Sequence, residues 1–417
     1  MCDHTNNFVP SREMVMIENS SGLSKSQKVA IFAAFIVAFA LVVLRPLLLK
    51  AGPSGDFMTI FRQTRAFWEG ESVYRGGNPY LPGIYVLMAY QVFLDPRTAW
   101  LIWRFLGIAL VGTLAWILHP LLKRELGNWK GNLALANVLL LSGMSPWSGN
   151  PGNLAGIMIV LAYALMSATS PFMAGVILGL ATALKYSLGL PFIVFALLGK
   201  RKRAGFVALS TFLIITMLGV MVAWAHGTSP DALLRSVAFG IQHVGGYEHS
   251  GFTRWFTSEN PYRFQLTTIV PLLHSLGLSG SEANLCCLAL LAMGVVLSLA
   301  IALRTGSFLS AAAVFSPFFL MCTYHRFYDT AILAFPVLLG WKTDDARAHW
   351  WLIVPSMTFF LSISNILQTR VLHAGFLSKS WLWNWVIGPH HWYALIVMSL
   401  SVSVLVLRKA GRMLARP

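Results

Sequence analysis

Residues 131–184 read GNLALANVLLLSGMSPWSGNPGNLAGIMIVLAYALMSATSPFMAGVILGLATAL and contain no charged side chain. A helix needs about 20 apolar residues to cross the roughly 30 Å hydrocarbon core of a bilayer. This stretch is therefore long enough for several crossings. It predicts a protein whose chain passes back and forth through a membrane as α-helices.

The composition of the whole chain agrees with this prediction. Hydrophobic residues make up 56% of the 417 residues and charged residues only 11%, whereas a soluble domain carries roughly a quarter charged residues. Further apolar stretches lie at residues 29–44, 105–122, 204–224, 283–303, 350–367 and 391–407. We therefore expect an all-α polytopic membrane protein, with one bundle of about 12 transmembrane helices at residues 29–408 and no separate soluble domain.

The net charge of +16 raises the question of a nucleic-acid partner. Its distribution argues against one, because much of the positive charge sits in short clusters between apolar segments, at residues 123–124, 200–203, 304, 342–347 and 408–416. Cytoplasmic loops of membrane proteins carry such an excess of lysine and arginine. We expect a cytoplasmic, disordered segment at residues 1–28, a cytoplasmic basic tail at 409–417, the lipid bilayer as partner and no nucleic acid.

With the basic clusters inside, the chain threads with large outer loops at about residues 50–98 and 226–282. Residues 82–94 are apolar but too short for a comfortable crossing, so they are expected to lie at the interface or to re-enter. The segments 188–199 and 330–341 are also short. Non-helical backbone at membrane depth is tolerated only in protein or beside a wet cavity, so this threading predicts a cavity open to the outside.

Polar side chains gather on the predicted outer side. Ionisable residues at membrane depth are costly and are functional candidates by default. The candidates are Asp56, Arg62, Arg65, Tyr80, Asn150, Asn153, Lys185, Glu248, Arg254, Arg263, His325 and Asp329. We find no P-loop, no convincing dinucleotide fingerprint and no histidine spacing typical of a zinc site.

Several of these residues lie in motifs that resemble glycosyltransferase family 87. Asp56-Phe57 follows the first predicted membrane helix, and Arg65-Ala66, Gly70, Val73-Tyr74 and Tyr80-x-Pro82 come next in order. Residues 174–185, AGVILGLATALK, resemble the later glycine-rich helix of that family, which ends in lysine. Members are GT-C enzymes embedded in the membrane, and they include polyprenol-phosphate-mannose-dependent α-mannosyltransferases.

The resemblance implies a transfer reaction at the outer, periplasmic or extracellular, face of a cell membrane. The donor would be a sugar, a hexose such as mannose, linked to polyprenyl phosphate, and the acceptor a glycan or glycolipid. Asp56 would be the base of an inverting reaction. Divalent metal helps some GT-C relatives, but this chain has few acidic residues on the predicted outer side and no Asp-x-Asp pair, so no metal cofactor is required. The donor phosphate would be bound by Lys185, Arg62, Arg65, Arg254 and Arg263, and the substrates positioned by Tyr80, Asn150, Asn153, Glu248, His325 and Asp329.

Other interpretations stay open at this point. Lys185 could be an interfacial anchor that snorkels, Arg254 and Arg263 could lie in a solvated loop, and His325 and Asp329 could make structural hydrogen bonds. The glycines at 175 and 179 are spaced for close helix packing. A transporter or flippase of a lipid-linked or small polar substrate is the main alternative function, and a scaffold membrane protein is another.

Overall fold

The computed structural model describes residues 24–40, 44, 52–71, 73–74, 80–142, 149–168, 170–245, 263–264, 266–323, 327–360 and 380–414. The regular elements within them are helices, so the predicted all-α class is confirmed. Four described helical segments are long and apolar enough to cross a membrane: Pro96–Ser142, Lys202–Ala225, Gly280–Thr305 and Trp383–Arg408. The chain is an all-α membrane protein, while the expected number of about 12 crossings stays a prediction.

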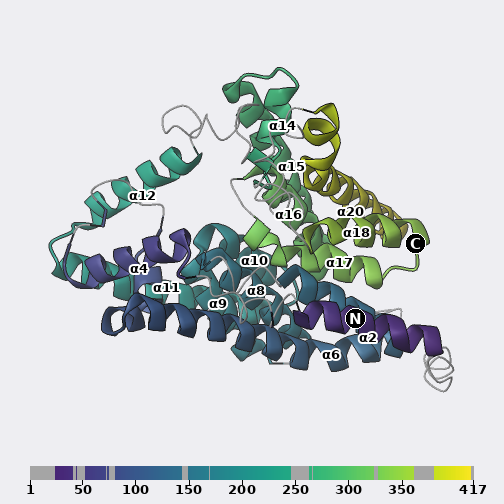
Figure 1. Ribbon diagram of the computed structural model, residues 1–417, viewed down its shortest axis with the longest axis horizontal. Coiled ribbons are helices and arrows are strands. Elements are labelled where there is room, and N and C mark those ends of the chain that lie inside the picture. The colour runs from purple at the N-terminus through teal and green to yellow at the C-terminus, as the bar shows by residue number, and fades with distance from the viewer. Residues whose placement is uncertain are drawn as a thin grey trace.

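The bundle is built mainly from long helices packed side by side (Figure 1). The longer helices are α2 (Lys25–Phe39), α4 (Gly55–Trp68), α6 (Pro96–Ser142), α8 (Pro151–Ser167), α9 (Pro171–Leu184), α10 (Tyr186–Leu198), α11 (Lys202–Ala225), α12 (Pro230–Gly245), α15 (Gly280–Thr305), α16 (Phe308–Cys322), α18 (Ala346–Ser356) and α20 (His390–Leu414). The shorter ones are α5 (Gly83–Leu87), η2 (Ala89–Phe93), α14 (Val270–Ser275), η4 (Phe327–Leu333), α17 (Ala334–Trp341), η5 (Met357–Phe359) and the π-helical turn η8 (Trp383–Ile387).

Helix α6 is a hairpin of two helices. At Gly127 the backbone leaves the helical region, with φ 79° and ψ 172°. The imidazole Nε2 of His119 lies 2.9 Å from Oδ1 of Asn132, although 13 residues of continuous helix would separate them by about 20 Å. The chain therefore turns back at Gly127, just after the basic cluster at residues 123–124 that was predicted to lie in a cytoplasmic loop.

Glycines allow α9 and α11 to pack closely. A Cβ atom at Gly175 of α9 would lie 2.7 Å from the carbonyl oxygen of Ala204, and one at Gly179 would lie 2.6 Å from that of Ala208. Both carbonyls belong to α11, which packs along α9. The close packing expected from the spacing of Gly175 and Gly179 is confirmed.

The two large predicted outer loops contain helices. Helix α4 lies in the first and buries one face, which includes Phe57, Phe61 and Phe67. Helix α12 lies in the second and stands apart from the main bundle in Figure 1. Both segments are too polar to cross a bilayer, and their amphipathic pattern suits a helix that lies along a surface. The short elements α5 and η2 cover residues 83–93, and neither is long enough to cross.

Polar contacts between distant segments join parts of the chain that were predicted to share a side. On the predicted inner side, Nζ of Lys342 lies 2.6 Å from Oε2 of Glu125 and donates to the hydroxyl of Tyr163 at 3.0 Å. The amide of Lys200 donates to the carbonyl of Gly306 at 3.1 Å. The first contacts join the end of α17 to the bend of α6 and to α8, and the last joins the loop after α10 to the loop after α15, so each joins segments that were predicted to lie on the inner side.

Candidate functional site

The site begins at the amino-terminal turn of α4. Ser54 caps this helix, and its hydroxyl accepts a hydrogen bond from the amide of Phe57 at 3.2 Å. Asp56 therefore lies in the first helical turn, where its negative charge interacts favourably with the helix dipole. Its side chain is half-buried. Local sequence thus places a carboxylate in the first turn of a helix that is held in place by the burial of Phe57, Phe61 and Phe67.

The turn before α8 contacts this carboxylate directly. Asn150 caps α8, because its Oδ1 accepts a hydrogen bond from the amide of Gly152 at 2.9 Å. Its Nδ2 donates to Oδ2 of Asp56 at 3.3 Å. Gly149 precedes it with φ 62°, and a Cβ there would lie 2.4 Å from Cβ of Phe57 and 2.7 Å from Cζ3 of Trp100. Glycine is needed at this turn both for its conformation and for its close approach to α4 and α6.

A buried ion pair lies on the other side of the α8 turn. Lys185 occupies the break between α9 and α10, with φ −149° and ψ 87°. Its ammonium group donates to both carboxylate oxygens of Asp329 in η4, at 3.0 and 2.8 Å. The side chain of Asp329 is fully buried and that of Lys185 is 14% exposed. Two residues that are far apart in sequence therefore form one polar unit inside the bundle.

Gly152 connects the two polar pairs. A Cβ atom there would lie 1.9 Å from Oδ1 of Asp329 and 2.7 Å from Nζ of Lys185. One turn later, a Cβ at Gly156 would lie 3.1 Å from Cβ of Ala331. The two glycines let η4 lie against α8, so the ion pair reaches the same helical turn that carries Asn150.

The electrostatics of this cluster combine a helix terminus with three charged side chains. The first amides of an α-helix have no partner within the helix, so its amino terminus carries partial positive charge. The amino terminus of α8 lies between Asp56 and the pair of Lys185 and Asp329. We name the five residues Asp56, Asn150, Gly152, Lys185 and Asp329 the α8 cluster. Through Asn150 it joins one carboxylate to a helix terminus that a fixed cation approaches at Gly152, which suits proton transfer next to an anion.

Four candidates from the sequence thus meet in one place, namely Asp56, Asn150, Lys185 and Asp329. A fifth, Asn153, is fully buried in the first turn of α8. Its backbone N–H donates a hydrogen bond to the backbone carbonyl of Asn150 at 3.1 Å.

Two arginines of α4 point elsewhere. Arg65 lies nine residues after Asp56, which is about two and a half helical turns, so it faces the opposite side of the helix. It lies over the ring of Phe61 and pairs with Glu69 at 3.6 Å. Arg62 is exposed and lies about a third of a turn away from the direction of Asp56.

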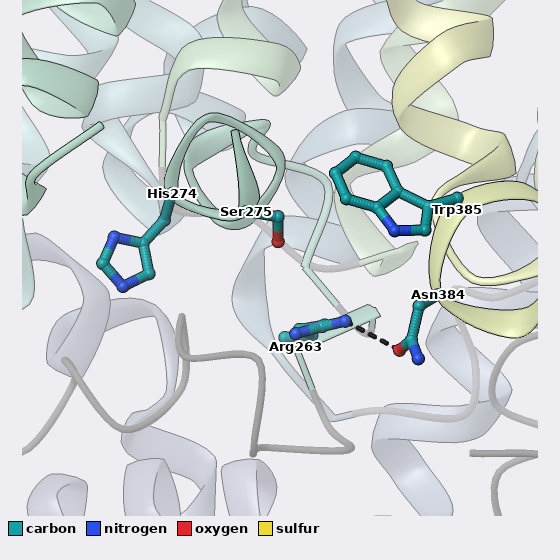
Figure 2. A pocket seen from close by; sticks show the side chains of 5 residues that line it. All are labelled: Arg263, His274, Ser275, Asn384 and Trp385. Atoms are coloured by element: carbon teal, nitrogen blue, oxygen red, sulfur yellow. Dashed lines mark hydrogen bonds between the residues drawn. The ribbon is translucent and has the colours of Figure 1, made fainter. Parts of the chain in front are cut away.

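The remaining candidates lie elsewhere or outside the described residues. Tyr80 lies just before α5, and its carbonyl accepts a hydrogen bond from the hydroxyl of Tyr74 at 3.4 Å. Arg263 lines a cavity beside α14 and η8, together with His274, Ser275, Asn384 and Trp385 (Figure 2). Glu248, Arg254 and His325 lie outside the described residues.

Several residues of the site were not predicted from sequence. Trp100 packs its ring 5.0 Å from Phe57, and Arg104, one turn later in α6, lies over Trp100 at 6.0 Å and is only 9% exposed. Arg104 could have been found as a charged residue within an apolar stretch. The sequence gives less indication that Gly152 belongs to the site, because only the fold shows that it faces Asp329 and Lys185.

A comparison with models of protein families gives a match. The sequence model of glycosyltransferase family 87 matches residues 78–324, which is more than half of the chain. The matched region contains Asn150, Gly152 and Lys185, whereas Asp56 precedes it and Asp329 follows it. A search of curated proteins finds no match.

Proposed function

Because the chain belongs to glycosyltransferase family 87, we propose that the α8 cluster transfers a sugar from a polyprenyl-phosphate donor to a hydroxyl group of a glycan or glycolipid. Membership makes the protein a membrane glycosyltransferase, and it favours this function over the transporter considered above. The single observation that carries the proposal is the bond from Asn150 to Asp56, which joins the carboxylate to the helical turn beside Lys185.

Asp56 is proposed as the base. Its carboxylate takes the proton of the acceptor hydroxyl, the acceptor oxygen forms a bond to the anomeric carbon, and the bond from that carbon to the phosphate oxygen breaks. Attack from the face opposite the phosphate inverts the anomeric centre. Asn150 orients the carboxylate through its Nδ2, and the oxygen that is not bonded there can face the acceptor.

Lys185 and the start of α8 are proposed to act on the leaving group. The departing polyprenyl phosphate gains negative charge, and fixed donors that face it stabilise the transition state. Asp329 holds Lys185 in one position. This arrangement favours an ordered cation over an anchor that follows the lipid surface. We further propose that the cluster faces the outside of the cell membrane and that the transferred sugar is a hexose such as mannose.

Replacement of Asp56 by Asn tests this function. The variant keeps the size of the side chain and can still bond Asn150, but it cannot accept a proton. A positioned base contributes about 10²–10⁴-fold, so transfer should slow by at least ~100-fold. The assay measures release of polyprenyl phosphate from a labelled polyprenyl-phosphate sugar, using purified protein in detergent.

Asp95→Asn is the matched control. Asp95 lies in the same predicted outer segment and caps α6 through bonds to the amides of Arg97 and Thr98. Asparagine also caps helices well, so this variant should keep its activity. Near wild-type turnover by Asp56→Asn, with equal expression and thermal stability, would show that the base is another residue.

A further inference from the structure

The cavity around Arg263 lies at one end of the membrane-spanning helices. It encloses about 330 Å³ and is lined by Arg263, His274, Ser275, Asn384 and Trp385. Ser275 ends α14, shortly before the candidate span Gly280–Thr305 begins, and Asn384 and Trp385 lie at the start of the candidate span Trp383–Arg408. The cavity therefore lies near the level at which the phosphate groups of a bilayer are found.

Arg263 is a buried cation with unused donors. Its side chain is only 3% exposed, and one nitrogen, Nη2, donates to Oδ1 of Asn384 at 2.8 Å. Among the residues that the structure describes, Nε and Nη1 have no hydrogen-bond partner. These two atoms carry three of the five guanidinium N–H donors. Figure 2 shows the guanidinium between Asn384 and the side chains of α14.

The surrounding residues hold this cation in place. Its guanidinium carbon lies 4.6 Å from the centre of the Phe264 ring. Phe264 packs against Trp383 and Trp392, and a Cβ atom at Gly388 would lie 2.6 Å from it. Asn384 presents its oxygen to Arg263 because its Nδ2 donates to the carbonyl of Ser380 at 3.1 Å. The donors of Arg263 are therefore fixed in direction before any ligand arrives.

Within the part of the chain that the structure describes, no acidic side chain of the cavity wall compensates the charge of Arg263. None of the other four lining residues is acidic. Burial lowers the pKa of Arg263 from its ordinary value, yet arginine stays protonated in proteins. A buried charge without a partner is strongly unfavourable, so the site gains most from a ligand that brings negative oxygens.

We propose that the Arg263 cavity binds the phosphate group of a phosphate ester. A phosphate offers several acceptor oxygens to the donors on Nε and Nη1, and arginine pairs with phosphate through charge-assisted hydrogen bonds. The volume leaves room for a group attached to the phosphate, beside the indole of Trp385. This inference rests on the contacts of the cavity and not on the transfer reaction proposed for the α8 cluster.

Calorimetric titration of the delipidated full-length protein tests the proposal. The probes are inorganic phosphate, a short-chain phosphatidylglycerol, and a diacylglycerol with the same acyl chains and no phosphate. We expect a phosphate-bearing probe to bind and the diacylglycerol to bind far more weakly. Binding of inorganic phosphate would identify a site open to soluble phosphates, and binding of phosphatidylglycerol alone would identify a lipid headgroup site.

Arg263→Met should weaken this binding by about tenfold to a hundredfold, because it removes charge-assisted bonds but keeps an elongated side chain. Arg235→Met is the matched control, since Arg235 is exposed and pairs with Asp231 on α12. Asn384→Asp supplies a carboxylate to Arg263 within the fold and should also weaken binding. If Arg263→Met does not fold, Asn384→Asp alone tests whether Arg263 binds the phosphate. The proposal would be overturned if neither phosphate-bearing probe bound the wild type, or if the folded variants bound these probes with unchanged affinity.

Discussion

Gly152 lies at the contact between the first turn of α8 and the ion pair of Lys185 and Asp329. A methyl group there would overlap Oδ1 of Asp329 and approach Nζ of Lys185. We therefore expect Gly152→Ala to separate the pair, lower the melting temperature and reduce transfer at least tenfold, because a displaced catalytic group loses much of its effect. Thermal unfolding in detergent and the transfer assay measure these two effects.

Gly112→Ala is the control for this prediction. Gly112 is exposed on α6, and a Cβ there would meet nothing within 4 Å. Alanine is about 1 kcal/mol more favourable than glycine within a helix, so this variant should be as stable as the wild type or slightly more so. Wild-type stability and activity in Gly152→Ala would mean that the α8 turn does not need the close contact with Asp329.

The contribution of the ion pair of Lys185 and Asp329 to stability can be measured separately from its contribution to activity. Removal of one partner of a buried pair leaves an uncompensated charge and costs about 3–5 kcal/mol. We expect Lys185→Met and Asp329→Leu each to destabilise the protein by this amount. The double variant should recover much of the stability, because apolar residues often replace a buried pair at little cost.

Activity should not recover with stability in the double variant if Lys185 stabilises the leaving phosphate. Melting temperatures and turnover of the three variants, measured under the same conditions, form a double-mutant cycle. A stable double variant with wild-type turnover would reduce the pair to a packing element. Lys185 would then have no part in the reaction.

Among the elements, the hairpin of α6 depends on Gly127. Its φ of 79° and ψ of 172° lie in a region that is essentially restricted to glycine. We expect Gly127→Ala to destabilise the protein by roughly 1–3 kcal/mol. Gly127→Asn should be no better, because asparagine tolerates the left-handed helical region but not this one.

Chemical unfolding of the purified protein measures both variants of Gly127. Asn128→Ala, one residue later in the helix, is the control and should have a small effect of either sign. If asparagine at 127 were as stable as glycine, the bend would have a conformation different from the one described here.

The sequence predicted best those elements whose position follows from the length and composition of an apolar segment. The break at Lys185 follows from a lysine at the end of an apolar segment, and the close packing of Gly175 follows from its spacing. Helices α4 and α12 were predicted as loops, because a search for membrane crossings depends on uninterrupted apolar length. The amphipathic periodicity of these two segments would have predicted them as helices.

At the scale of the whole molecule, the threading placed four of the candidate residues on one side, where the structure brings them together, but it did not predict which residues pair. Asp56, Asn150, Lys185 and Asp329 each lie at the end of an apolar segment, and positive clusters place these ends on one side. The pairing of Lys185 with Asp329 depends on how η4 packs against α8, which is a long-range property. The placement of Arg263 in a separate cavity depends on the packing of Phe264 against α20, and no local pattern indicates it.

The sidedness of the bundle is the last prediction. The contact of Lys342 with Glu125 and that of Asp329 with Lys185 define two ends, and the basic clusters at the first end predict that it is cytoplasmic. Cysteines placed at the exposed positions Ser229 and Asp344, in a background without the four native cysteines, report on the two ends. An impermeant maleimide should label Ser229→Cys in intact cells and Asp344→Cys only after permeabilisation. The reverse pattern would place the α8 cluster in the cytoplasm, where the donor and acceptor proposed here would have to be reconsidered together.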